Sequence, residues 1–122
     1  MGIQACQALT ESVNPGTYQL MLDTQGHRWR YDLYIPPQYN PNTPTPLVIT
    51  LHGTGGNGRY HLNQASWKDK ADEAGFIVVA PYGQPVVPGR PRATRLWNVS
   101  LRPSNPRSQI DDVQFFLSLI HI

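Results

Sequence analysis

The alternation of apolar and polar residues predicts two amphipathic strands near the start of the chain. Residues 17–23 and 29–35 alternate with a period of two, which is the spacing of a strand with one buried face. The apolar positions are Tyr18, Leu20 and Leu22 in the first segment and Trp29, Tyr31, Leu33 and Ile35 in the second. Gln25 and Gly26 lie between the segments and suit a tight turn, so we expect an antiparallel hairpin.

Two later apolar segments, 47–51 and 76–80, are short and uninterrupted, which is typical of buried strands. We expect a helix between them, because Ser66 and Asp69 form a capping box and Gly75 stands where the helix would end. A strand, a helix and a second strand in this order predict a unit with two parallel strands.

The last third of the chain predicts a long loop followed by a helix. Residues 81–106 are rich in proline and arginine and contain no periodic apolar pattern. Ser108 and Asp111 then form a second capping box. Apolar residues at helical spacing follow, and we expect this stripe to face the core. Its members are Ile110, Val113, Phe116, Leu117 and Ile120.

Composition narrows the possible classes of function. The chain has 122 residues, enough for one modest core, and a net charge of only +2. Five arginines lie between Arg90 and Arg107, but prolines interrupt them, so we expect a solvated loop and no nucleic-acid partner. No apolar run is long enough for a membrane span. The single cysteine, Cys6, excludes an internal disulfide, and nothing stands at metal-ligand spacing, so no metal or cofactor is expected.

The glycine-rich segment after the strand 47–51 carries the strongest chemical signal. His52 is followed by four glycines within six positions, namely Gly53, Gly55, Gly56 and Gly58. Such a loop turns sharply and exposes backbone N–H groups, which favours binding of an anion. Open α/β sheets bind their ligands at the carboxyl ends of parallel strands, where this loop is expected to lie.

Two chemistries compete for this loop. Residues 53–58 spell G-x-G-x-x-G, the dinucleotide fingerprint, which also needs a helix that begins at once and an acidic residue after the next strand. We expect residues 57–64 to be loop, and the strand 76–80 ends in Pro81-Tyr82-Gly83. The sequence therefore favours an oxyanion hole, in which the turn gives a backbone N–H to a tetrahedral intermediate. A nucleotide-binding domain remains the alternative of another class.

Four segments together carry a resemblance to a known fold. They are Tyr31-Asp-Leu-Tyr-Ile-Pro36, the strand and turn at 46–53, the helix and strand at 71–83, and Trp97-Asn98 with 111–115. In this order they resemble the opening half of an α/β-hydrolase, in particular the secreted esterases grouped with polyhydroxybutyrate depolymerases and feruloyl or acetylxylan esterases. The fold class implied is α/β, with an antiparallel hairpin and then a parallel β-α-β unit, truncated before the nucleophile elbow.

The resemblance implies a serine esterase whose triad lies beyond this chain. The sequence contains no G-x-S-x-G, so no catalytic nucleophile, acid or base is assigned to it. What the resemblance places here is the oxyanion-hole loop, made of His52, Gly53, Thr54, Gly55 and Gly56. Within it the N–H of Thr54 is the expected donor, and His52 is expected to orient the loop. Trp97 either lines a substrate pocket or pins the long loop to the core.

The expected organisation is a mobile N-terminus at 1–16 and the N-terminal part of one α/β-hydrolase domain at 17–122. Residues 117–122 match the translation of a transposon mosaic-end adapter used in sequencing, so we expect a scar there. The partner implied is an ester substrate, either a small molecule or a polymer. A peptidase or a dienelactone-type hydrolase stays open, and an extracellular or periplasmic location rests on the resemblance alone. The sequence indicates no oligomeric state.

The isolated chain is expected to be inactive and only marginally folded. The reason is that, in the resembled topology, the strand 47–51 would lie beside a fifth strand that this sequence does not contain. An apolar strand with one unpaired edge promotes aggregation.

Overall fold

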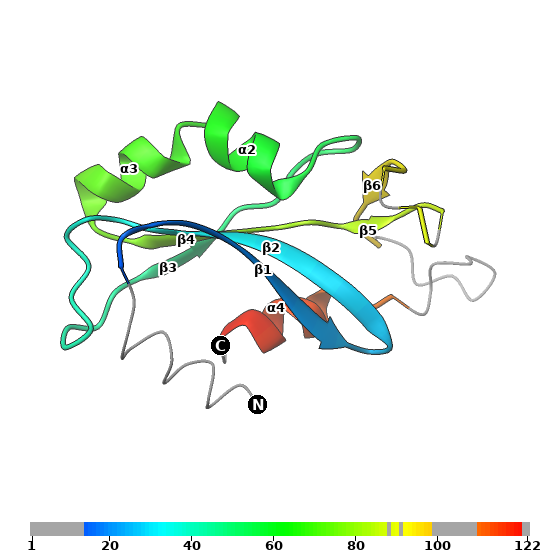
Figure 1. Ribbon diagram of the computed structural model, residues 1–122, viewed down its shortest axis with the longest axis horizontal. Helices are drawn as coiled ribbons and strands as arrows, with labels where there is room; N and C mark the ends of the chain where they lie inside the picture. Colours follow the sequence, from blue (N-terminus) through cyan, green and yellow to red (C-terminus); the bar gives the residue numbers. More distant parts are fainter. Residues whose placement is uncertain (1–13, 88, 91, 99–109, 121–122) are drawn as a thin grey trace.

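The computed structural model describes residues 14–87, 89–90, 92–98 and 110–120. Its centre is a four-stranded mixed sheet of order β1-β2-β4-β3 (Figure 1). The strands are β1 (Gly16–Thr24), β2 (His27–Ile35), β3 (Leu47–Ile49) and β4 (Ile77–Pro81). Helices α2 (Gly58–Gln64) and α3 (Trp67–Ala74) cover one face of this sheet, and α4 (Asp112–Ile120) covers the other.

The hairpin expected from the alternating pattern is confirmed. β1 and β2 pair antiparallel from Gly16 opposite Ile35 to Thr24 opposite His27. Gln25 and Gly26 form the turn with φ values of 57° and 71°, the left-handed pair that a two-residue hairpin turn requires. β1 begins at Gly16, so this residue belongs to the sheet and not to a mobile N-terminus, while residues 1–13 lie outside the described ranges.

The parallel strand–helix–strand unit is also confirmed. β3 pairs parallel with β4, with Leu47 opposite Ile77, and β4 pairs antiparallel with β2 on its other side. β4 is therefore the strand that joins the hairpin to β3. β3 is shorter than expected and ends at Ile49, although the N–H of Thr50 still donates to the carbonyl of Val79 at 2.9 Å.

The core is divided between the two faces of the sheet. Beneath α2 and α3 lies a small cluster of buried residues: Leu62, Ala71, Val78 and Ala80. The larger cluster faces α4 and consists of Trp29, Tyr31, Leu33, Ile35, Val79, Phe115 and Leu119. The rings of Trp29 and Phe115 stack there with centroids 4.2 Å apart.

The prediction of a loop at residues 57–64 is wrong, because α2 begins directly after the glycine turn. Asn57 caps this helix, and its side chain accepts a hydrogen bond from the N–H of Tyr60 at 2.8 Å. Leu62 is fully buried against the sheet, so packing stabilises a short helix whose own propensity is weak.

The capping box predicted at Ser66 is likewise wrong. Ser66 adopts a left-handed conformation with φ of 54°, and its side chain makes no capping hydrogen bond, because this residue turns the chain from α2 into α3. The predicted end of α3 is confirmed, since Gly75 closes the helix with φ of 76°. Ser108 of the second box lies outside the described residues. Asp111 caps α4 by accepting from the N–H of Gln114 at 2.9 Å.

The stripe predicted to bury α4 is wrong for three of its five residues. Val113, Leu117 and Ile120 are 65%, 53% and 56% exposed, whereas Phe115 and Leu119 are buried. Ile110 and Phe116 are partly buried against the core, as expected. α4 is apolar on more than one side, so periodicity alone did not fix its rotation. The Trp29–Phe115 stack and two bonds between the side chain of Gln25 and the backbone of Asp111 hold the observed orientation.

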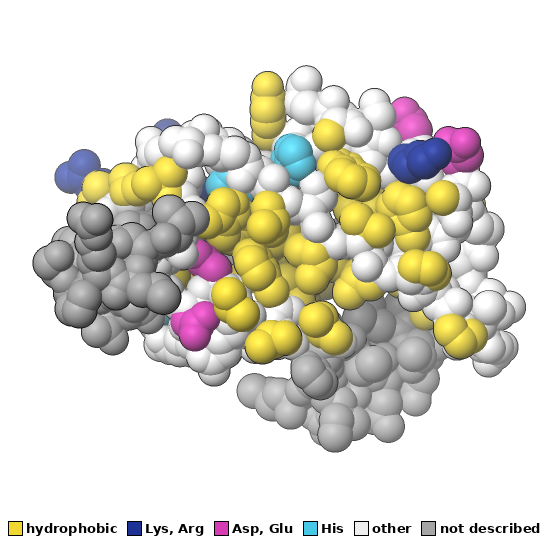
Figure 2. Space-filling view, turned by 180° about the vertical axis from the view of Figure 1, so that it is seen from behind, with side chains coloured by type: hydrophobic (Ala, Val, Ile, Leu, Met, Phe, Trp, Pro, Cys, Tyr) yellow, Lys and Arg dark blue, Asp and Glu magenta, His cyan; other side chains and the backbone are white. Residues whose placement is uncertain are grey.

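The segment predicted as one long loop contains a short ladder. β5 (Gln84–Pro85) and β6 (Arg95–Leu96) pair antiparallel beside the end of β4. Residues 99–109, which include part of the predicted loop, lie outside the described ranges. None of the helices in the described ranges combines the length and the apolar character needed to cross a membrane. Apolar side chains nevertheless gather over the rear face of the molecule (Figure 2).

Candidate functional site

The glycine-rich loop leaves β3 and makes a tight turn before α2. The N–H of Gly56 donates to the carbonyl of Gly53 at 3.0 Å, and Gly55 has a φ of 81° that a side chain would strain. Thr54 and Gly55 lie exposed at the apex of this turn. Within the described residues, the N–H of Thr54 has no hydrogen-bond acceptor. A rigid turn with an uncommitted N–H is the feature that an oxyanion hole needs.

His52 holds the base of this turn through both ring nitrogens. It is buried, with an exposed fraction of 3%. Nε2 accepts from the N–H of Gly83 at 3.0 Å, so Nδ1 carries the proton and donates to the carbonyl of Gly53 at 2.7 Å. Burial lowers the pKa of His52, and the charges of His61 and Arg95 lower it further, against the opposing effect of the Gly53 bond. A neutral imidazole with both nitrogens engaged suits a positioning role.

Trp97 packs over His52 rather than standing apart from the loop. Its Nε1 donates to the carbonyl of His52 at 2.8 Å, and the two rings lie 4.9 Å apart. Phe116 also contacts Trp97, edge to face, with ring centroids 5.4 Å apart. These contacts favour the interpretation in which Trp97 pins the segment after β6, and its role in a substrate pocket stays a prediction.

Gly58 fixes the distance between α2 and β4. A Cβ atom at this position would lie 2.2 Å from the carbonyl oxygen of Ala80 and 2.8 Å from the ring of Tyr82. No side chain fits there without displacing backbone. The sequence signalled this residue only as the third glycine of the fingerprint.

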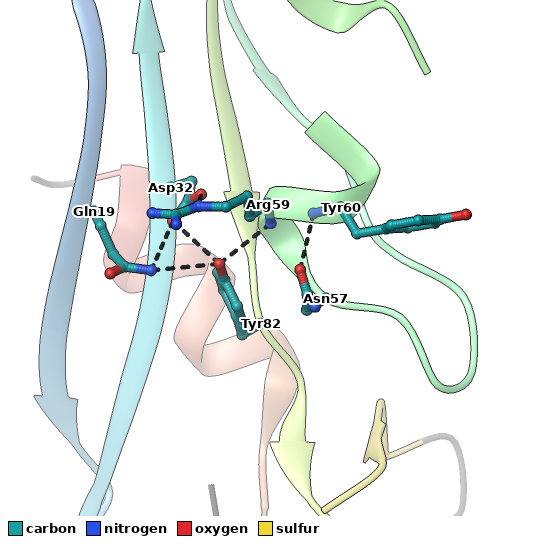
Figure 3. Close-up of polar contacts among 6 residues, drawn as sticks. All are labelled: Gln19, Asp32, Asn57, Arg59, Tyr60 and Tyr82. Atoms are coloured by element: carbon teal, nitrogen blue, oxygen red, sulfur yellow. Dashed lines mark hydrogen bonds and ion pairs between the residues drawn. The ribbon is translucent and has the colours of Figure 1, made fainter. Parts of the chain in front are cut away.

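A buried carboxylate under α2 escaped the sequence analysis. Asp32 is fully buried, and its Oδ1 accepts long bonds from the hydroxyl of Tyr82 at 3.4 Å and from Nε2 of Gln19 at 3.5 Å (Figure 3). Nε of Arg59 lies 3.4 Å from Oδ2 of Asp32 and forms an ion pair. The available signal was only that Asp32 lies on the face of β2 that alternation assigns to solvent, and α2 packs over that face.

A cavity of about 520 Å³ opens beside the glycine turn. The backbone of Gly55 and Gly56 forms part of its wall. Four arginines line it together with neutral residues, and we call this cavity the arginine pocket. They are Arg30, Arg59, Arg92 and Arg95. The sequence placed the run from Arg90 to Arg107 in a solvated loop. That holds for the exposed Arg90 and Arg92 but not for Arg95, which is half-buried.

The finding of α2 changes the case for a nucleotide. The helix does begin at Gly58, and its close packing on β4 is what the third glycine of a dinucleotide fingerprint provides. The other objection remains, because β4 ends at Pro81 and the residues that follow it, Tyr82 and Gly83, are not acidic.

Metal binding has no support in the described part of the chain. No group of three His, Cys, Asp or Glu side chains among the described residues is placed to hold a metal ion.

Comparison with known proteins relates part of the chain to an esterase. No family model matches the sequence. Over 51 residues the chain is 37% identical to a bifunctional acetylxylan esterase/xylanase from Neocallimastix patriciarum. The aligned residues make up 42% of this chain and 7% of that much longer protein. This partial similarity supports an ester-hydrolase relationship and leaves substrate and mechanism open.

Proposed function

We propose that this chain is part of a serine-dependent carboxylic ester hydrolase of the α/β-hydrolase fold and supplies one half of its oxyanion hole. The observation that carries the proposal is the uncommitted N–H of Thr54 at the apex of a turn that His52 holds from below. The partial similarity to an acetylxylan esterase supports the same reading. Polyesters and plant-polysaccharide esters are the proposed substrates.

The proposed chemistry divides between this loop and residues outside the printed sequence. A serine activated by histidine would attack the ester carbonyl and form an acyl-enzyme. The oxygen that becomes negative would accept one bond from the N–H of Thr54 and a second from the residue after the serine. Loss of one such donor costs about 2.7–4 kcal/mol of transition-state stabilisation. The same loop would serve a peptidase or a dienelactone-type hydrolase.

A nucleotide-binding domain is the second candidate, favoured by the start of α2 at Gly58. The two candidates differ in a simple observation. Resequencing of the gene across the codon for Phe116, where the expected scar begins, and onward should reveal a G-x-S-x-G followed by an acid and a histidine in the first case only.

The decisive variants of the protein encoded by the whole gene are Thr54→Pro and Thr54→Ala. Thr54 occupies the second position of the turn, where proline is well tolerated, so Thr54→Pro removes the N–H and keeps the turn. We expect Thr54→Pro to lower kcat on a soluble acetyl ester by about 10²- to 10³-fold, and Thr54→Ala to have little effect. Equal kcat/KM values for the two variants, at equal Tm, contradict the assignment.

A further inference from the structure

The arginine pocket concentrates positive charge without a matching carboxylate in its wall. Its four guanidinium groups come from β2, from α2 and from the segment around β6. None of the described residues that line it is Asp or Glu. The one ion pair that the described residues make with these arginines joins Arg59 to Asp32, which lies fully buried, and leaves Arg30 and Arg92 without a carboxylate partner among the described residues.

Arg30 has a side-chain donor without a hydrogen-bond acceptor. Its Nε is buried and has no hydrogen-bond partner within the described residues. Its guanidinium lies over the ring of Tyr82, 4.9 Å from the centroid. Buried donors in proteins are nearly always satisfied, so this unpaired Nε, on a side chain that also lines the cavity, is a second sign that the guanidinium lacks an acceptor.

Two guanidinium groups also share one aromatic ring. Arg95 lies 5.7 Å from the centroid of Tyr82, and its Nη1 donates to the carbonyl of Gly83 at 2.9 Å. Burial lowers the pKa of Arg95, and the neighbouring charge of Arg30 lowers it further. A bound anion would offset this repulsion, and Arg59, whose side chain is 60% exposed, lines the same cavity while its Nε pairs with Asp32.

We propose that the arginine pocket binds a carboxylate carried by the ester substrate. The planar forks of Arg30, Arg59 and Arg92 match a carboxylate, and Gly55 and Gly56 in the wall place that anion next to the candidate oxyanion donor. The free acid end of a polyester and a uronic-acid branch of a polysaccharide both supply this group. Anion binding stands on the pocket alone, and assignment of the anion to an ester substrate rests on the proposed function.

The test is a titration of the 122-residue chain, followed by calorimetry, with acids and their neutral methyl esters. One pair is a linear trimer of 3-hydroxybutyrate with a free or methylated acid end, and the other is trigalacturonate and its methyl ester. We expect the acid of at least one pair to bind about 10- to 100-fold more tightly than its ester. The pair that shows the difference identifies the source of the carboxylate.

Variants locate the binding. Arg30→Gln and Arg92→Gln are each expected to weaken binding of the acid about 10-fold or more, whereas Lys70→Gln removes one charge from α3 and leaves it unchanged. Arg92 is exposed, so Arg92→Gln remains informative if Arg30→Gln fails to fold by circular dichroism. Equal affinity for acid and ester overturns the proposal, as does tighter binding of inorganic phosphate or NAD, which favours a nucleotide. If the acid binds but Thr54→Pro and Thr54→Ala have equal kcat/KM values, the proposed oxyanion hole is refuted while the proposed anion site stands.

Discussion

His52 joins two parts of the chain that are 31 positions apart, because its ring bonds to Gly53 on one side and to Gly83 on the other. The arrangement works only while the ring is neutral, since protonation of Nε2 would replace an acceptor by a second donor facing the N–H of Gly83. The glycine turn and the end of β4 both depend on this one protonation state, and the ring of Trp97 packs against the same imidazole.

Stability should therefore fall in mildly acidic solution. The folded pKa of His52 lies below its ordinary value of 6.5, so the unfolded chain takes up the proton first as the pH is lowered. The contribution of His52 is fully present above pH 6.5, decreases below it, and is lost once the pH has passed the folded pKa. Urea unfolding between pH 7.5 and 5 checks this. His52→Asn should lower stability by about 1–3 kcal/mol at pH 7.5 and flatten the pH dependence. An unchanged slope in the variant argues against this role.

Gly58 and Gly53 give a matched pair of substitutions in the same loop. Gly58→Ala places a Cβ 2.2 Å from the carbonyl of Ala80, so we expect a loss of about 1–3 kcal/mol in the free energy of unfolding. Gly53→Ala meets no atom within 4 Å and should change stability by no more than about 0.5 kcal/mol. Thermal unfolding of both variants measures the difference, and similar Tm values would remove the packing argument.

At the scale of elements, the local sequence pattern predicted the positions of the strands but not the features that depend on contacts between distant residues. Period-two alternation located β1 and β2, and short apolar runs located β3 and β4. α2 was missed because Gly58 and Asn63 are weak helix formers, and tertiary packing of Leu62 overrides them. The rotation of α4 was missed because Phe115 and Val113 are both apolar, and distant residues, Trp29 and Gln25, decide between them.

The candidate site likewise contains one part that the sequence predicted and one part that it did not. The glycine turn and His52 stand together in the sequence and were visible there. Asp32, Arg59 and Tyr82 come from β2, α2 and the end of β4, so only folding brings them together (Figure 3). Arg30 and Arg95 likewise contact the same ring, that of Tyr82, only in the folded chain.

The observed orientation of α4 makes a direct prediction. Phe115 is fully buried against Trp29, so Phe115→Ala should cost about 3–5 kcal/mol. Leu117 is 53% exposed, and Leu117→Ala should cost less than about 1 kcal/mol. Chemical denaturation of the two variants compares them. A larger loss of stability in Leu117→Ala than in Phe115→Ala would favour the buried face of α4 that the sequence predicted.

At the scale of the whole molecule, helices cover the two faces of the sheet, whereas no described strand pairs with its outer edges. Among the described strands β1 and β3 stand at the edges, and the segment from Leu47 to Leu51 carries exposed apolar side chains at both ends. Unpaired backbone groups next to apolar side chains promote pairing between chains.

A single lysine at this edge should therefore improve solubility. Leu47 is 40% exposed, and we expect Leu47→Lys to slow the rise of light scattering during incubation at high protein concentration. Tyr60→Lys is the control, because Tyr60 is 60% exposed on α2 and the charge change is identical. An equal improvement in both variants would attribute the aggregation to net charge and not to the strand edge.

The position of β4 also sets the order in which the chain can become a sheet as it is synthesised. The hairpin β1–β2 is complete once residue 35 has been made, and β3 follows by residue 49, yet these elements share no ladder with each other. The hairpin and β3 can join one sheet only after residues 77–81 have been made, because β4 pairs with β2 on one side and with β3 on the other. A nascent chain shorter than this carries a hairpin and an apolar strand that no β4 joins, so we expect this protein to need a chaperone most during translation.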